Sequence, residues 1–305
     1  MRIWVTGGAG CVGSHLVEML LNAGHRVDAL DDLSTGRFSH LTDARRREGF
    51  GFHQVDVRGD ELIGLAVRQR PDVIVHLAGN PFRPGGFADP RAEASLSVLS
   101  ILNVLAAAQA VDGAVVGVVH ATPDAVDAPS TPAEVSAWTI VDHLRIAHEV
   151  SGVLTTCVAI SNVYGPRQRI VGGGPLVASM VAAIAGGGSV VIDHGDHTRD
   201  LLFVDDAVDA LLRCVERMPG GVIPVGSGTV TRPSAVADLL ARVAGVDVSK
   251  VEGPERPGDR DRPAWPLDQA SERLGWRPWT TLEDGLRRCW RAATDAMTQG
   301  APVSG

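Results

Sequence analysis

Apolar and polar positions alternate through the first half of the chain in blocks that predict strands and helices in turn. Short apolar runs predict buried strands, and longer stretches with apolar residues three and four positions apart predict amphipathic helices. Because the two alternate through residue 160, we predict an α/β fold with a Rossmann-type doubly wound parallel sheet and right-handed crossovers. Expected strands cover residues 3–5, 26–30, 51–57, 72–79, 114–120 and 154–160, and expected helices cover 14–23, 60–70, 91–110 and 133–150.

The pattern changes after Gly165, where Gly and Pro interrupt shorter apolar segments. Such punctuation is typical of a smaller, loop-rich domain. We therefore expect a first domain at residues 1–165 and a C-terminal substrate-binding domain at 166–305. Elements near 198–212 are expected to return to the first domain.

Composition and charge narrow the possible partners. The net charge is −8 and the pI is about 5.7, so no general attraction to nucleic acid or an anionic membrane is implied. The four cysteines are far apart and form no Cys-x-x-Cys pair, which favours reduced thiols over zinc binding. The chain enters a strand at once, and we expect no apolar run to reach the length that spans a membrane. We expect a cytoplasmic protein with neither a nucleic-acid nor a membrane partner.

Three glycines, Gly7, Gly10 and Gly13, lie between the first predicted strand and its helix. Such glycines permit a tight turn and close approach of a pyrophosphate, which binds the free N–H groups of the helix N-terminus. The second strand ends at Asp31 and Asp32, acids that can accept hydrogen bonds from an adenosine ribose and repel a 2′-phosphate. Strand, glycine turn, helix, strand and acid together predict dinucleotide binding, with NAD favoured over NADP.

Other cofactor contacts are expected from the polar loop after Asp32 and from the turn that follows the strand at 72–79. Asp56 either accepts from an adenine amino group or caps a helix. His76, within a fully apolar strand, is interpreted as a core residue. The predicted cofactor-binding residues are Gly7, Gly10, Cys11, Val12, Gly13, Asp31, Asp32, Leu33, Ser34, Thr35, Gly36, Asp56, Val57, Leu77, Ala78 and Gly79.

Several motifs, in this order, resemble those of the extended short-chain dehydrogenases/reductases of the nucleotide-sugar epimerase and dehydratase type. They are TGGAGCVG (6–13), DDLSTG (31–36), HLA (76–78), NVYGP (162–166), TRD (198–200), VDD (204–206) and RPGD (256–259), and they span nearly the whole chain. The resemblance implies NAD as cofactor and a nucleotide sugar as substrate. It also implies that Asn162 contacts the sugar diphosphate and that Arg199 and Arg256 hold the nucleotide and its phosphates. The alternative makes both arginines structural salt-bridge partners of Asp200 and Asp259.

The catalytic set of that family is replaced here. Alignment with the family pattern puts Ala133 at the tyrosine position, Ala137 at the lysine position, Pro123 at the Ser/Thr position and Ser97 at the supporting Asn position. The chain contains only one tyrosine, Tyr164, and one lysine, Lys250, so no Tyr-x-x-x-Lys pair exists.

Oxidation of a hydroxyl requires a base, and alanine methyl groups supply none. Asp124 aligns with the acid of sugar-nucleotide dehydratases and is the candidate substitute, although it equally suits a turn. Thr122 is the candidate to bind a substrate oxygen. Glu134, beside the vacated tyrosine position, is explained more simply as a first-turn helix acid. Tyr164 is interpreted as structural, and no metal site is expected.

Three hypotheses follow from these residues. The chain is an enzyme that acts on a nucleotide sugar through a rebuilt acid/base set, a non-catalytic NAD- and nucleotide-sugar-binding regulator or partner subunit, or an enzyme for an unrelated substrate. The retained diphosphate-binding motifs argue against the third. In relatives, the helices that match 91–110 and 133–150 pair across a two-fold axis. We therefore expect a homodimer, or a heterodimer with a related subunit, through faces that include Leu96, Leu99, Leu102, Trp138, Ile140 and Leu144.

Overall fold

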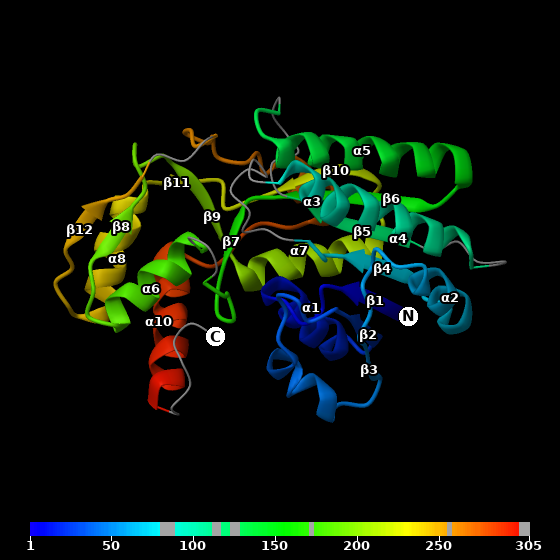
Figure 1. The fold of residues 1–305 in the computed structure, drawn as a ribbon, viewed down its shortest axis with the longest axis horizontal. Helices are drawn as coiled ribbons and strands as arrows, with labels where there is room; N and C mark the ends of the chain where they lie inside the picture. The colour runs from blue at the N-terminus through cyan, green and yellow to red at the C-terminus, as the bar shows by residue number, and fades with distance from the viewer. Residues whose placement is uncertain (80–88, 112–116, 123–128, 171–173, 255–257, 299–305) are drawn as a thin grey trace.

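The computed structural model describes residues 1–79, 89–111, 117–122, 129–170, 174–254 and 258–298 (Figure 1). The strands are β1 (Arg2–Thr6), β2 (Arg26–Leu30), β3 (Phe50–His53), β4 (Val73–His76), β5 (Gly117–Thr122), β6 (Leu154–Ile160), β7 (Asn162–Tyr164), β8 (Val190–Ile192), β9 (Arg199–Phe203), β10 (Gly221–Val225), β11 (Val230–Thr231) and β12 (Lys250–Glu252). The helices are α1 (Cys11–Asn22), α2 (Glu61–Gln69), α3 (Pro90–Ala94), α4 (Ser100–Gln109), α5 (Pro132–Ser151), α6 (Leu176–Ala185), α7 (Val204–Arg217), α8 (Pro233–Ala244), α9 (Asp268–Leu274) and α10 (Leu282–Thr298).

Seven strands form the central sheet in the order β10-β6-β5-β4-β1-β2-β3, and each neighbouring pair is parallel. The chain builds outward from β1 to β3, then returns to the other side of β1 and builds outward again from β4. The strand order therefore reverses between β1 and β4, which confirms the predicted doubly wound sheet. In such sheets the ligand crevice lies beyond the carboxyl ends of the strands at this reversal.

Helices cover both faces of this sheet, as Figure 1 shows. One face packs against α1 and α7, and its core includes Val5, Leu16 and Leu211. The opposite face packs against α2, α4 and α5, and its core includes Trp4 and Ile140. Because both faces are covered, β1 is buried along almost its whole length and is apolar from Ile3 to Val5, as expected for a central parallel strand.

Most expected elements are present, with boundaries shifted by a few residues. Helix α1 begins at Cys11, because the last three residues of the glycine motif already lie in its first turn. Strand β3 ends at His53, although the expected strand continued to Val57. Beyond that end, Val55 and Val57 are still buried in the core. The alternating pattern therefore marks burial correctly but overestimates the length of the strand.

The helix that spans Pro90–Gln109, made of α3, α4 and a π-helical segment (Ser95–Leu99) between them, corrects one expectation about the sequence. By length and mean hydropathy alone it could cross a membrane, whereas no run of that kind was expected. In the structure this helix packs against α2, α5 and strands of the central sheet. Its apolar character therefore agrees with a place in the layer that covers the sheet.

The second half of the chain builds a smaller lobe and also returns to the sheet. Helices α6, α8 and α10 pack together beside the two-stranded sheet of β8 and β12 (Figure 1). Helix α7 packs against α1, and β10 extends the central sheet next to β6. These contacts agree with the expected return near 198–212, and we propose the domain division at residue 165 on this basis.

Candidate functional site

The glycine turn lies at the strand reversal, and its shape requires glycine. Gly7 has φ +69°, and a Cβ there would lie 2.8 Å from the Ala78 nitrogen. A Cβ at Gly13 would lie 2.1 Å from the Gly7 oxygen, so the helix start and the turn pack backbone to backbone. A Cβ at Gly10, in contrast, would meet only that oxygen, at 3.1 Å. Gly7 and Gly13 are therefore required by packing within the protein, whereas the backbone around Gly10 is left accessible to a ligand.

Gly10 is also the N-cap residue of α1, and no side chain among the residues described forms a cap there. The first N–H groups of a helix have no partner within the helix and favour an anion. A turn without a Cβ beside such N–H groups fits the pyrophosphate of a dinucleotide. The predicted contacts from Cys11, Val12 and Gly13 are the N–H groups of this first turn. The Cys11 thiol itself donates to the Pro166 carbonyl at 3.2 Å, so it points away from that role.

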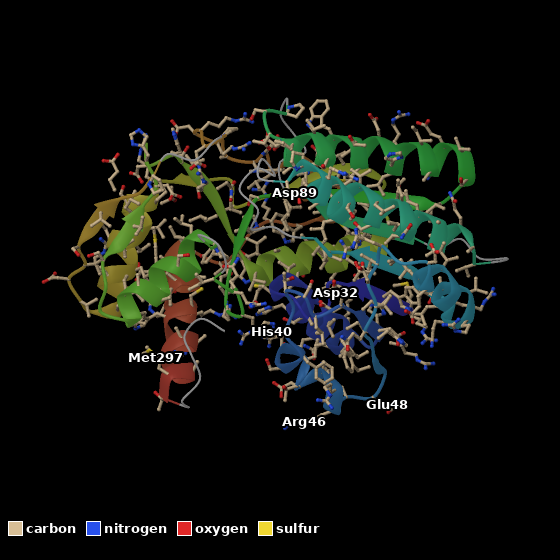
Figure 2. All side chains as sticks on the ribbon, in the orientation of Figure 1. Asp32, His40, Arg46, Glu48, Asp89 and Met297 are labelled. Carbon is tan, nitrogen blue, oxygen red and sulfur yellow. The ribbon has the colours of Figure 1, made fainter. Side chains whose placement is uncertain are left out.

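The structure separates the roles of the two acids at the end of β2. Asp31 is 6% exposed, and its carboxylate accepts from the N–H groups of Ala9 at 2.9 Å and Leu33 at 2.8 Å. Burial raises the pKa of Asp31, and these two hydrogen bonds offset part of that rise. Asp32, labelled in Figure 2, accepts instead from the N–H and hydroxyl of Ser34. Asp31 therefore joins the glycine turn and is the better candidate for a ribose, a distinction that the sequence did not provide.

The loop of Leu33, Ser34, Thr35 and Gly36 folds back onto the same acid. A Cβ at Gly36 would lie 2.6 Å from a carboxylate oxygen of Asp31, so this position also requires glycine. Arg169 donates to the Thr35 carbonyl at 2.9 Å and connects this loop to the chain after β7. The predicted cofactor residues of the first 36 positions thus form one continuous surface.

Asp56 does not cap a helix, because the N-cap of α2 is Asp60. Instead it forms an ion pair with Arg58, whose Nη2 lies 2.6 Å from Oδ2. The hydrogen bonds from Arg58 lower the pKa of Asp56. The predicted role at an adenine stays a prediction. Val57 is 8% exposed, and its carbonyl accepts from the Asn103 side chain, so its predicted role at the cofactor also stays a prediction.

The turn after β4, whose backbone is predicted to approach the cofactor, packs on the glycine turn. The N–H groups of Leu77 and Ala78 both donate to the Thr6 hydroxyl at 3.3 Å, while a Cβ at Gly79 would meet open space. His76 is fully buried and hydrogen-bonds to Thr6 at 2.7 Å and to Ser100 at 3.1 Å. The interpretation of His76 as a core histidine is therefore confirmed.

The vacated catalytic positions lie on α5 and on the helical layer beside it. Ala133 is partly exposed in the first turn of α5, and Ala137 is 3% exposed one turn later. Ser97, at the supporting Asn position, donates to Glu93 at 2.5 Å. Glu93 is 6% exposed and lies on α3, which packs against α5. Sequence reasoning missed Glu93, although its spacing of four residues from Ser97 places both on one helix face.

Part of the predicted catalytic set lies outside the described residues. Pro123 and Asp124 fall in such a segment, as does Arg256 of the predicted phosphate clamp. Thr122 is the last residue of β5 and pairs with Ala159 of β6, but its side chain is outside the description. The position of Thr122 at a carboxyl end of the sheet agrees with its expected location, and its role stays a prediction.

Arg199 lies at the start of β9 and is held by protein groups. Its Nη2 is 2.7 Å from Asp259 Oδ1, and its Nη1 donates to the carbonyls of His197, Thr198 and Arg260. The alternative structural role therefore applies to Arg199 through Asp259, and a phosphate would have to share this guanidinium. The suggested partner Asp200 is fully buried elsewhere, where it accepts from the N–H groups of Ser227, Gly228 and Trp265.

Asn162 begins β7, pairs in register with Leu201 of β9, and is exposed. This pairing places its backbone two residues from Arg199 along the neighbouring strand, so both predicted substrate residues lie at one small sheet. Tyr164, two residues later, is 2% exposed and donates to the Leu282 carbonyl at 3.4 Å. Burial raises the pKa of Tyr164. These facts agree with a structural rather than an acidic role for this tyrosine.

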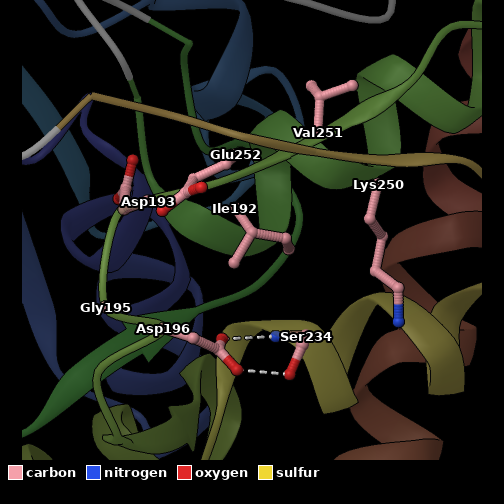
Figure 3. A pocket seen from close by; sticks show the side chains of 8 residues that line it. All are labelled: Ile192, Asp193, Gly195, Asp196, Ser234, Lys250, Val251 and Glu252. Atoms are coloured by element: carbon pink, nitrogen blue, oxygen red, sulfur yellow. Dashed lines mark hydrogen bonds between the residues drawn. The ribbon is translucent and has the colours of Figure 1, made fainter.

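A pocket of about 380 Å³ lies in the C-terminal lobe, between β8, β12 and the start of α8 (Figure 3). Three of its charged side chains form hydrogen bonds or ion pairs with one another or with neighbouring residues. Asp196 accepts from the N–H and hydroxyl of Ser234, Lys250 pairs with Asp238, and Glu252 pairs with His194. Within the described part of the chain, no group of three or more metal-type ligands occurs. This pocket belongs to the smaller lobe at the left of Figure 1, whereas the glycine turn lies between β1 and α1 in the central part of the molecule.

Comparison with known proteins agrees with this geometry. Residues 3–226 match the model of the NAD dependent epimerase/dehydratase family. The chain is 34% identical to a UDP-glucose 4-epimerase of Mycolicibacterium smegmatis, over 94% of this chain and 97% of that one. It is 30% identical to a dTDP-glucose 4,6-dehydratase of Neisseria gonorrhoeae, over 98% and 97% of the two chains.

Solved structures give the same result. The UDP-glucose 4-epimerase of Thermotoga maritima, solved with UDP-glucose, superposes with a TM-score of 0.89 at 27% identity, over 97% of this chain and 100% of that one. The enzyme of that name from Thermus thermophilus, solved with NAD, gives 0.84 at 28% identity, over 94% and 97%. The glycine turn, the uncapped α1 and Asp31 fit the cofactor of these proteins. The chain belongs to the NAD-dependent epimerase/dehydratase family, and its cofactor is NAD.

Proposed function

We propose that this protein acts on a nucleoside-diphosphate sugar with bound NAD, as an epimerase or dehydratase whose acid/base set lacks Tyr-x-x-x-Lys. The observation that carries the proposal is the combination of an intact cofactor surface around Gly10 and Asp31 with relatives that act on UDP- and dTDP-sugars. When bound, NAD accepts a hydride from the sugar carbon that bears the reacting hydroxyl. The residues of this chain must bind the sugar nucleotide, orient it and remove the hydroxyl proton.

Removal of the hydroxyl proton is the difficult step here, because Ala133 and Ala137 occupy the positions where the family pattern has the acid/base pair. We propose Asp124 as the base and Thr122 as the group that hydrogen-bonds the reacting oxygen. Thr122 is the last residue of β5, next to β4 in the sheet, and Asp124 follows it two positions later in the sequence. A carboxylate at this position can take the hydroxyl proton as hydride leaves the carbon, and it can return the proton to the product.

A second candidate function rests on the same two alanines. Without Tyr and Lys, the chain is a binding protein that holds NAD and a nucleotide sugar as a regulator or as the partner subunit of an active relative. General acid/base help is typically worth about 10²–10⁴-fold, so a protein that has lost it without replacement turns over negligibly.

Turnover distinguishes the two candidates. Purified protein is incubated with NAD and a panel of UDP-, dTDP- and GDP-sugars, while NADH absorbance and product mass are followed. The enzyme hypothesis predicts a product from one of them and about a 10²–10⁴-fold loss of rate in Asp124→Asn. Tight binding of a nucleotide sugar without turnover would support the binding protein instead. Unchanged turnover in Asp124→Asn would exclude only this base.

A further inference from the structure

Glu134 is buried in the first turn of α5 and is the centre of a charged cluster. It is 3% exposed, and its carboxylate accepts from the N–H of Ser130 at 2.6 Å and from the Ser130 hydroxyl at 2.9 Å. Arg262 forms a close ion pair with Oε1, and Nη2 of Arg260 lies 3.5 Å from Oε2. Arg260 also hydrogen-bonds the Ser130 hydroxyl. We call Ser130, Glu134, Arg260 and Arg262 the Glu134 clasp.

An ordinary first-turn acid does not require these contacts. The helix is already capped by Thr131, whose hydroxyl accepts from the Glu134 N–H at 3.2 Å. First-turn acids usually interact with the helix dipole from an exposed position, whereas this carboxylate is buried against two guanidinium groups. Burial raises the pKa of Glu134, but the hydrogen bonds from Ser130 and Arg262 more than offset that rise and hold it below its usual value. The clasp is therefore an ion pair at neutral pH.

The two arginines belong to a segment, residues 258–262, that also binds the side chain of Arg199. Asp259 and the Arg260 carbonyl bind the Arg199 guanidinium, as described above. On the same segment, Asp261 accepts from the N–H of Thr198 at 2.8 Å, and the N–H of Arg262 donates to the Thr198 carbonyl at 3.3 Å. Residues 258–262 therefore contact β9 on one side and the first turn of α5 on the other.

In the family pattern, the contact with Arg199 lies toward the diphosphate of the substrate, and the contact with the first turn of α5 lies toward its sugar. Arg199 is the predicted phosphate residue, and Ala133, next to Glu134, is the vacated position that faces the reacting carbon in the family pattern. The sugar of a nucleotide sugar lies between its diphosphate and that position. We propose that the Glu134 clasp forms the wall of the sugar compartment and positions it against α5. This inference rests on the proposed function and adds a sugar-specific positioning role for Glu134, Arg260 and Arg262.

The test compares a nucleoside diphosphate with its sugar conjugate. Calorimetry gives the dissociation constants of NAD, UDP and UDP-glucose for wild type and Glu134→Gln, which removes the charge but keeps the shape. If wild type does not bind UDP-glucose, the pairs dTDP with dTDP-glucose and GDP with GDP-mannose are used. We expect NAD and the diphosphate to bind within about twofold of wild type and the sugar conjugate at least about tenfold more weakly, a loss of about 1.4 kcal/mol.

Glu149→Gln is the matched control, since Glu149 lies on the same helix and forms an exposed ion pair with Arg145. It should leave all three constants unchanged. Arg260→Gln, at an arginine whose side chain is 35% exposed, gives the same readout if Glu134→Gln does not fold. Arg262→Lys keeps the charge without the planar fork, so we expect an intermediate loss for the sugar conjugate.

Three outcomes would overturn the inference. Equal weakening of NAD, the diphosphate and its sugar conjugate would show a merely structural clasp. Undiminished binding of the conjugate by a folded Glu134→Gln or Arg260→Gln variant would exclude a role at the sugar and leave the proposed function standing. Wild-type protein that binds none of the nucleotide sugars would refute the proposed function, and the clasp's role would fall with it.

Discussion

At the scale of single residues, two buried histidines predict that the folded protein is sensitive to acid. The rings of His76 and His120 stack with centroids 5.1 Å apart. His76 has Thr6 and Ser100 as partners, whereas neither ring nitrogen of His120 makes a hydrogen bond of normal geometry to the residues described. Burial lowers the pKa of His120 to about 4, and the nearby His76 backbone offsets only part of this effect. Burial likewise lowers the pKa of His76 well below its ordinary value.

We predict that stability falls on acidification and that His120→Phe reduces the fall. Below about pH 6.5 the unfolded chain binds a proton at His120, while the folded chain does so only near pH 4, so protonation favours unfolding in this window. Phenylalanine keeps the ring without the buried nitrogens. Urea unfolding should give similar free energies for the two proteins at pH 7.5, and the variant should be about 2 kcal/mol more stable than wild type at pH 5. Identical pH dependence of the two proteins would refute this assignment.

The residue scale also shows what the sequence could predict and what it could not. The glycine turn was predictable, because the backbone contact between Gly7 and Gly13 falls within a single strand–turn–helix pattern of the sequence. The choice between Asp31 and Asp32 was not, since both follow β2 and only the loop geometry directs one of them to the glycine turn. The ion pair of Arg199 with Asp259 was anticipated only as an alternative.

At the scale of elements, hydrophobic periodicity located α5 but not the partners of its first turn. The residues that bind Glu134 lie up to 128 positions away in the sequence, beyond the reach of any local pattern. The alternation of charges in Asp259, Arg260, Asp261 and Arg262 was the available signal, but a charge run usually marks a solvated surface. Long-range ion pairs of this kind become visible only when the fold brings a loop of the second lobe to a helix of the first.

Helix α5 permits a direct test of the vacated catalytic positions. We predict that Ala133→Tyr combined with Ala137→Lys raises turnover of a nucleotide sugar by about 100-fold, since a general acid/base is worth at least that much when correctly placed. Lysine must enter a position that is only 3% exposed, so some loss of stability is expected. Product formation by mass spectrometry, with NAD bound, gives the measurement.

The matched control for this experiment uses the same spacing on the outer face of the helix. Ile146→Tyr combined with Val150→Lys adds the same groups four residues apart, where the two residues are 46% and 79% exposed. It should leave turnover unchanged. If the Ala133→Tyr, Ala137→Lys variant binds both ligands normally and gains nothing, the reacting carbon does not face this turn of α5.

At the scale of the whole molecule, the outer surface of the helical layer carries a group of exposed apolar side chains. Leu99 and Leu102 on the long helix are 43% and 37% exposed, and Val135 and Trp138 on α5 are 53% and 44% exposed. Two other residues expected on this surface, Ile140 and Leu144, are only 2% exposed and belong to the core. The apolar surface is therefore narrower than the sequence indicated, but it still covers two adjacent helices.

An apolar surface of this kind favours association, because its burial removes hydrocarbon from water at about 25 cal/mol per Å². We predict a homodimer, or a heterodimer with a related subunit, formed through this layer. Leu102→Glu places a charge in its centre and should convert the wild-type dimer to monomers at micromolar concentration in light scattering. Val67→Glu, at a residue that is 47% exposed on α2, adds the same charge outside this surface and should leave the dimer intact. Monomeric wild-type protein would refute self-association, and equal dissociation by both variants would place the interface elsewhere.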